Sequence, residues 1–125
     1  MKEFKIKKCM KCGALVKIFE DCTCDNCGIK CCNEEMKELK PNSTDVSFEK
    51  HVPTYEIKDD MLYIKVDHVM EEDHFIEWIS VVDNNKETIT YFNYGENPTM
   101  NIKYTSNVRI YSYCNKHGLW MTEVE

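Results

Sequence analysis

The chain has 125 residues and a formal net charge of -6. This length allows one ordinary domain, or a small module followed by a compact domain. The acidic balance argues against nucleic-acid binding, which needs a basic surface, and the apolar runs are too short to span a membrane. The charged residues 1–8 lack the apolar stretch of a signal peptide, so we expect a cytoplasmic protein.

Eight cysteines are many for a cytoplasmic chain, and seven of them fall between residues 9 and 32. A disulfide framework would connect the rest of the chain as well, so this distribution favours metal binding. The N-terminal segment has few large apolar side chains and needs a metal or a partner for its stability. We therefore predict a metal-binding module over residues 1–40, a polar linker at 39–45 and a second domain over residues 41–125.

The module contains two cysteine knuckles and one pair of adjacent cysteines. The segment 9–13 has the sequence CMKCG, in which two thiolates can hold one metal ion and the glycine permits the tight turn. A second pair must complete a tetrahedral site. The segment 24–28, CDNCG, would give a zinc ribbon or a rubredoxin-like iron site, and Cys31-Cys32 is the other candidate. Spacing alone leaves both choices open, and either choice leaves Cys22 and two other thiols without a ligand role.

The second domain has the pattern of a mainly β protein. Alternating or β-branched runs predict strands at residues 55–57, 61–66, 76–82, 88–94, 101–104 and 108–113. Asp59-Asp60 predicts a hairpin turn between the first two of them. Short strands at this spacing, without a helical period, indicate a small antiparallel sandwich of about seven strands. We expect Trp78, Tyr113 and Trp120 in its core.

The histidines of this domain suggest a metal centre. The chain has four of them, His51, His68, His74 and His117, and one cysteine outside the module, Cys114. All four imidazoles stand at predicted strand ends or in loops, where a rigid sheet commonly positions ligands. An isolated histidine is usually a surface or hydrogen-bonded side chain without a metal. If the five side chains converge, a soft thiolate among imidazoles indicates a redox transition metal rather than calcium or magnesium.

Five motifs follow one another along the chain: CxxCG, then Cys-Cys, then EKHVP at 49–53, then HxxxxxHxxEW at 68–78 and YCNxHGxW at 113–120. With these motifs the chain resembles, over nearly its whole length, the desulfoferrodoxin family of two-iron superoxide reductases. The resemblance implies a desulforedoxin-like module followed by an immunoglobulin-like antiparallel β-sandwich. It also implies two iron ions per chain, one in the module and one catalytic iron in the sandwich.

The resemblance also implies a role for each motif residue. Four equatorial imidazoles and one axial thiolate would hold the catalytic iron: His51, His68, His74, His117 and Cys114. Four thiolates would hold the N-terminal iron, which favours the Cys-Cys pair over the second knuckle: Cys9, Cys12, Cys31 and Cys32. Glu49 and Lys50 would lie over the open sixth position of the catalytic iron. The chain departs from the family pattern at Val69, usually proline, and at Asn33, usually glycine, although asparagine tolerates a left-handed backbone.

The activity that the resemblance implies is the one-electron reduction of superoxide to hydrogen peroxide without oxygen release. Lys50 would attract the anion and help to deliver a proton, and Glu49 would occupy the vacant position of the oxidised iron. A rubredoxin-type protein would be the electron donor, and the assembly would be a homodimer. The rival interpretations are a non-catalytic rubredoxin-like electron carrier and a zinc-ribbon binding module, neither of which explains the order of Cys114 and the histidines.

Overall fold

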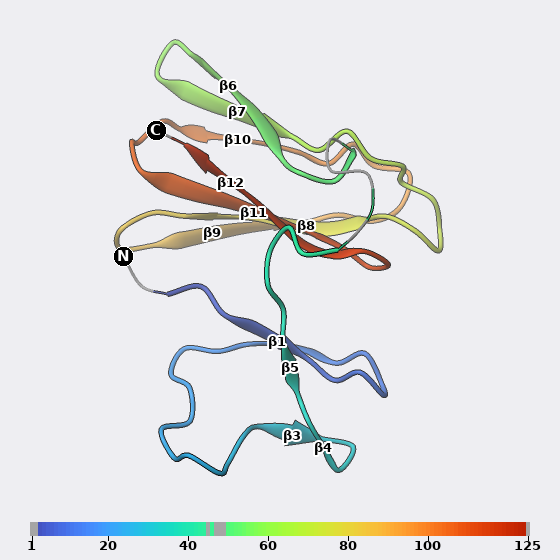
Figure 1. Cartoon of the computed structure of the whole chain (residues 1–125). Helices are drawn as coiled ribbons and strands as arrows, with labels where there is room; N and C mark the ends of the chain where they lie inside the picture. Colours follow the sequence, from blue (N-terminus) through green and yellow to red (C-terminus); the bar gives the residue numbers. More distant parts are fainter. Residues whose placement is uncertain (1–2, 45, 47–49, 125) are drawn as a thin grey trace. The chain divides into compact units, whose positions relative to one another are not determined.

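A computed structural model of the chain describes residues 3–44, 46 and 50–124 (Figure 1). Its described residues contain twelve β-strands and no α-helix, which confirms the prediction of a mainly β protein. Backbone contacts divide the chain into two compact units, one over Lys2–Lys40 and one that contains Pro41–Glu125, and each is considered by itself. Within the described ranges, no helix is long and apolar enough to cross a membrane.

The N-terminal unit is built from very short strands. These are β1 (Ile6–Lys8), β2 (Leu15–Lys17), β3 (Lys30–Cys31), β4 (Glu34–Glu35) and β5 (Lys37–Glu38). The strands β2, β1 and β5 form one antiparallel sheet in that order, and β3 pairs with β4. Its buried apolar side chains are few: Ile6, Cys9, Ile18 and Met36. So small a core supplies little stability by itself, which is typical of a module that a metal ion holds together.

An ion-pair cluster centred on Asp21 adds to the stability of this unit. The Lys5 ammonium donates to Asp21 Oδ2 at 3.0 Å, and the Lys7 ammonium donates to Asp21 Oδ1 at 2.9 Å. The backbone N–H of Cys22 donates to the same Oδ1 at 2.8 Å. The hydrogen bond from Lys7, followed by that from Lys5, holds the pKa of the Asp21 carboxyl below its usual range. The ionised form of the Asp21 carboxyl is therefore more stable in the folded chain than in the unfolded chain.

We expect acid to destabilise the N-terminal unit through Asp21. A carboxyl whose folded-state pKa is depressed stabilises the fold fully above its unfolded-state pKa of about 4, and this contribution disappears as the pH falls through the lower folded-state value. Asp21→Asn should therefore lower the unfolding temperature at neutral pH and weaken the acid dependence. Thermal unfolding across this pH range measures both effects, with Asp25→Asn as the exposed-carboxylate control. An acid dependence in Asp21→Asn equal to that of the wild type would contradict this role.

The C-terminal unit is a sandwich of two antiparallel sheets (Figure 1). Its strands are β6 (Thr54–Lys58), β7 (Met61–Lys65), β8 (Ile76–Val82), β9 (Glu87–Tyr91), β10 (Thr99–Lys103), β11 (Val108–Cys114) and β12 (Gly118–Val124). One sheet has the order β10-β7-β6 and the other β12-β11-β8-β9. The described residues of this unit thus contain the seven strands that the sequence predicts, although β12 was not among the predicted ranges.

The core lies between the two sheets and is made from alternate residues of their strands. Its central members come from β7, β8, β10, β11 and β12: Leu62, Ile64, Ile79, Val81, Met100, Val108, Ile110 and Val124. Cys114, at the end of β11, belongs to the same buried cluster. Trp78 and Tyr113 stack as a cross-strand pair with ring centroids 5.6 Å apart, and both are buried, as is Trp120. The core therefore extends to the end of the sandwich where Cys114 lies.

Two local features hold the strands of the sandwich in register. Asp59 and Asp60 have φ values of 53° and 64°, the left-handed pair of a type I′ turn, and join β6 to β7 as predicted. The Asn42 amide donates to the Met121 carbonyl at 3.1 Å and accepts from the Met121 N–H at 2.9 Å. Part of the predicted linker is therefore bonded to the edge of β12, where it satisfies backbone groups of an edge strand.

Candidate metal centre

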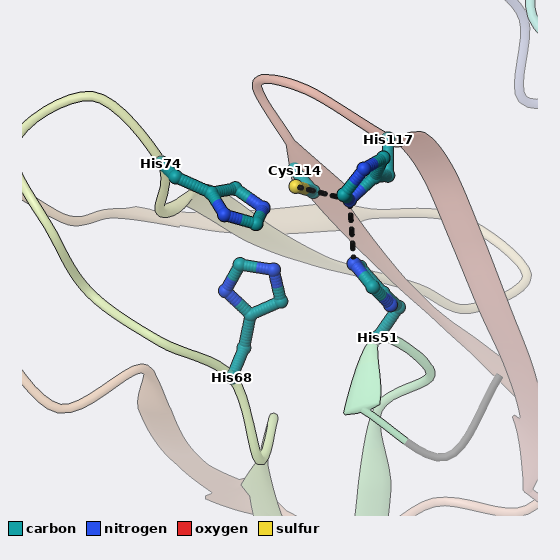
Figure 2. A group of neighbouring side chains, drawn as sticks. All are labelled: His51, His68, His74, Cys114 and His117. Atoms are coloured by element: carbon teal, nitrogen blue, oxygen red, sulfur yellow. Dashed lines mark hydrogen bonds between the residues drawn. The ribbon is translucent and has the colours of Figure 1, made fainter. Parts of the chain in front are cut away.

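The five candidate ligands of the sandwich come together from four separate segments (Figure 2). His51 precedes β6, His68 follows β7 and His74 precedes β8. Cys114 is the last residue of β11, and His117 lies in the turn to β12. Antiparallel strands end and begin at the same edge of a sheet, so these segments meet at one end of the sandwich. The candidate ligand atoms of all five residues lie within 4.8 Å of one another.

The four imidazoles form a closed, four-sided arrangement. The ring centroids of neighbours are 4.7 Å apart for His51 and His68, 4.7 Å for His68 and His74, 5.0 Å for His74 and His117, and 4.9 Å for His117 and His51. Neighbouring rings are inclined by 70° to 88°, and His51 lies diagonally opposite His74 at 6.5 Å. Cys114 Sγ is 3.9 Å from His117 Nδ1. Several nitrogen donors and one sulfur therefore face a common point.

Two buried nitrogen atoms in this group indicate that something else occupies its centre. Nε2 of His68 and Nε2 of His74 are buried and have no hydrogen-bond partner in the described part of the chain. A buried polar atom without a partner costs about 1–3 kcal/mol and is rare in folded proteins. Nδ1 of His68 lies 2.5 Å from the Val69 carbonyl oxygen, so a proton on Nδ1 leaves the Nε2 lone pair free. The residues present therefore fit a metal ion, which would satisfy both nitrogens.

The surroundings of two of the imidazoles favour the neutral form, which is the form that binds metal. Burial lowers the pKa of His68, and the neighbouring His51 and His74 lower it further. Burial and the same two neighbours also lower the pKa of His117. Burial raises the pKa of the Cys114 thiol, while the backbone N–H groups of Lys116 and His117 act in the opposite direction. A bound cation would stabilise the thiolate, which these N–H groups are already placed to support.

Residues outside the predicted set hold the loops of this centre together. Asn115 Oδ1 accepts from the Phe75 N–H at 3.0 Å, and Asn115 Nδ2 donates to the Asp73 carbonyl at 3.0 Å. These two bonds tie the loop of His74 to the turn that follows Cys114. Sequence reasoning assigned no role to Asn115, although its place directly after Cys114 in the last motif was a signal that it acts at the centre.

Two residues of the sandwich contact His51 and fix its position. Ser112 Oγ donates to the His51 carbonyl at 3.1 Å. The indole of Trp120 stacks on the His51 ring with centroids 4.9 Å apart and planes inclined by 22°. Trp120, which is buried as expected for a core residue, thus also orients one imidazole and shields it from water.

The N-terminal unit contains a second candidate centre made of four thiols. Its members have sulfur atoms within 4.8 Å of one another: Cys9, Cys12, Cys31 and Cys32. Cys12 Sγ is 3.7 Å from Cys31 Sγ, which is 3.8 Å from Cys32 Sγ. Side chains of neighbours in an extended chain point apart, but Cys32 and Asn33 have φ values of 55° and 63°. This left-handed turn brings the two adjacent thiols close together. Asn33 adopts the left-handed backbone conformation that asparagine is expected to tolerate.

The pKa values of two of these thiols are shifted in opposite directions. Hydrogen bonds from the Cys12 and Lys11 backbone N–H groups lower the pKa of Cys9 to about 6. Hydrogen bonding with the Cys12 and Cys9 side chains raises the pKa of the Cys31 thiol to about 12. Four thiolates cannot share so small a volume without a positive ion, so this group fits a tetrathiolate metal site. Cys24 and Cys27 lie outside this group and are paired with each other.

Comparisons with known proteins identify the family of the chain. The desulfoferrodoxin family model matches residues 43–123. The chain is 34% identical to a desulfoferrodoxin of Syntrophotalea carbinolica over 125 residues, which cover 97% of each chain. It is 35% identical to a desulfoferrodoxin homolog of Archaeoglobus fulgidus over 122 residues, which cover 94% of this chain and 95% of the relative. The chain belongs to the desulfoferrodoxin family.

One solved structure is similar in fold to this member of the desulfoferrodoxin family. The superoxide reductase from Treponema pallidum superposes with a TM-score of 0.70 at 20% identity, over 96% of this chain and 98% of that chain. At this level of identity the likeness concerns the fold alone. The similarity covers residues of both units of the chain. It therefore agrees with the mainly β fold that the sequence predicts.

The remaining residues of the desulfoferrodoxin motifs are placed only in part. Lys50 is exposed, directly before the buried His51. Glu49 lies outside the described residues, so its position over the metal stays a prediction. Val69, the departure from the family's proline, is 49% exposed and still offers its carbonyl to His68. The departure therefore leaves the His68 imidazole within the group.

Proposed function

We propose that this desulfoferrodoxin is a superoxide reductase. It would combine one superoxide anion with one electron and two protons to give one hydrogen peroxide, without releasing oxygen. The observation that carries the proposal is the convergence of four histidines and one cysteine on one point. Membership of the desulfoferrodoxin family and the order of the five motifs support it.

We propose two iron ions per chain. His51, His68, His74, His117 and Cys114 would hold the catalytic ion, and Cys9, Cys12, Cys31 and Cys32 the other. Iron in the first site would supply the single electron and a coordination position for a small anion. The imidazoles add no charge and the thiolate adds one negative charge, so a divalent cation leaves this site net positive. That charge would attract superoxide to an otherwise acidic protein.

The side chains around the centre have separable roles in this proposal. Lys50 would draw the anion toward the site and help to deliver a proton, because it is exposed and adjacent to His51. Lys116, 3.7 Å from Asp73, would add a second positive charge near His117. Glu49 would cap the site in its oxidised state. Trp120 would keep water from the covered face of His51.

The further partners are also proposals. A rubredoxin-type protein would deliver the electron, and the chain would act as a homodimer in the cytoplasm. The tetracysteine iron would either relay this electron or stabilise the N-terminal unit. Its four thiolates, two of them adjacent in the chain, are compatible with both roles.

Metal analysis and a superoxide assay test the proposal together. We expect two irons per chain, one with a tetrathiolate spectrum and one without, and peroxide formation without oxygen release. Zinc alone, or a single tetrathiolate iron, would favour the non-catalytic electron carrier instead. That alternative leaves the convergence of the five C-terminal ligands unexplained.

We expect Lys50→Ala to slow the reaction with superoxide. Loss of one nearby positive charge should reduce the second-order rate by roughly tenfold and weaken its dependence on ionic strength. Pulse radiolysis at several salt concentrations measures both effects. Lys58→Ala removes an exposed lysine from β6 and serves as the control, and Glu49→Ala should change the rate little. A wild-type rate in Lys50→Ala would refute the steering role.

A further inference from the structure

Three cysteines of the N-terminal unit belong to neither metal group: Cys22, Cys24 and Cys27. All three are exposed and lie in the long connection between β2 and β3. The structure pairs Cys24 with Cys27, whereas Cys22 is a free thiol. Exposed loops commonly carry the reactive groups of a protein, so this pair is a candidate for chemistry of its own.

The backbone of this segment suits a disulfide. The Cα atoms of Cys24 and Cys27 are 5.7 Å apart, inside the range of about 4.4–6.8 Å that a disulfide spans without moving the chain. The Cys27 sulfur also lies 3.4 Å from the Cys24 carbonyl oxygen, so the CxxC segment is folded back on itself.

A metal ion is a poorer explanation for this pair. A tetrahedral site needs four ligands, and four of the seven N-terminal cysteines already form one group. Only Cys22 remains as a further thiol for Cys24 and Cys27. A stabilising role is also weak, because a cross-link over two intervening residues removes little freedom from the unfolded chain. Reversible thiol chemistry is the remaining property that an exposed CxxC pair supplies.

We propose that Cys24 and Cys27 form a dithiol site that hydrogen peroxide oxidises to a disulfide. One thiolate attacks a peroxide oxygen, the O–O bond breaks, and a sulfenic acid and hydroxide form. The second thiol then attacks the sulfenic sulfur, the S–S bond forms and water leaves. Two thiols and one peroxide thus give one disulfide and two waters. The inference rests on the proposed function only for the source of the peroxide, which is the product of superoxide reduction.

The site would let the chain consume or register the peroxide that it makes. Each oxidised pair removes one peroxide, and a dithiol reductant returns it to the reduced form by exchange. Because both cysteines are exposed residues, neither step requires the unit to unfold. The tetracysteine group would be spared as long as its thiolates remain bound to metal.

The experiment uses the metal-loaded chain, reduced with a dithiol and then freed of reductant. Hydrogen peroxide is added directly, remaining thiols are alkylated, and peptides are mapped by mass spectrometry. We expect the loss of two free thiols per chain, one Cys24–Cys27 disulfide and unchanged metal content. Cys22→Ser should behave as the wild type, and Cys24→Ser should leave a Cys27 sulfenic acid that a 1,3-dione reagent traps.

Three results would overturn the proposal. Cys24 and Cys27 could both remain open to alkylation after peroxide, the disulfide could include Cys22, or Cys24→Ser could lose a metal ion. A superoxide assay on the same preparation separates this inference from the proposed function. Disulfide formation in a chain that does not reduce superoxide would refute the proposed function alone, because the peroxide is supplied from outside.

Discussion

Replacing Cys114 with serine should abolish superoxide reduction and empty the five-residue centre of metal. Cys114 is the only side chain of the group that binds a metal as an anion, and a serine hydroxyl stays protonated at neutral pH. Loss of a residue that merely supports a ligand costs roughly 10- to 100-fold in metal affinity or activity, so loss of the thiolate should cost more. Metal content and the rate of superoxide consumption measure the effect.

Cys114→Ser also shows whether the loss of activity comes from the metal centre alone or from unfolding of the sandwich. Cys114 is completely buried in the core cluster, and serine has nearly the same shape, so the sandwich should remain folded. Thermal unfolding of the metal-free forms checks this, and the tetracysteine spectrum should persist. Cys22→Ser, an exposed thiol of the other unit, is the matched control and should retain full activity. A wild-type rate in Cys114→Ser would show that the reaction does not use this centre.

The second large effect is expected for Cys9→Ser, which should unfold the N-terminal unit. Cys9 is 1% exposed, accepts a hydrogen bond from the Cys12 N–H and lies in a core of only a few side chains. A structural metal site of this kind contributes on the order of 10 kcal/mol to the folding of a small module. We therefore expect loss of the tetracysteine metal and rapid proteolysis within residues 3–40.

The C-terminal centre of Cys9→Ser is expected to keep its metal. Limited proteolysis followed by mass spectrometry locates the cleavage, and metal analysis of the remaining fragment tests the sandwich. Full superoxide reductase activity in this variant would support a structural role for the first metal, whereas a loss of donor-coupled turnover alone would support electron relay. A protease-resistant N-terminal unit without metal would contradict the stability argument.

Much of the fold follows from local signals in the chain. The Asp59-Asp60 turn and the alternation on both sides of it predict the β6–β7 hairpin, because a type I′ turn needs residues that tolerate left-handed backbone. Strand β12 was missed because Leu119, Trp120 and Met121 form a continuous apolar run that does not alternate. Its strand character depends on pairing with β11, which is a tertiary property.

For the two candidate centres, too, the sequence predicted one part and the tertiary structure decided the rest. The order of the motifs pointed to His51 and Cys114 as partners although 62 residues separate them, but only the meeting of both sheets brings them together. Sequence spacing also left two cysteine pairs in competition for the N-terminal site. The left-handed turn at Cys32 and Asn33 makes an adjacent pair usable, and it left Cys24 and Cys27 free to pair with each other.

By itself the sequence determined the β class and the family and named the candidate ligands, because these depend on residue identity, turn chemistry and motif order. Only the tertiary structure decided which thiols lie together, how four imidazoles surround one point and which side chains hold them there. The physical reason is that a metal site is defined by distances of a few ångströms between residues far apart in the chain. Those distances arise from strand pairing and from the backbone angles of a few turns.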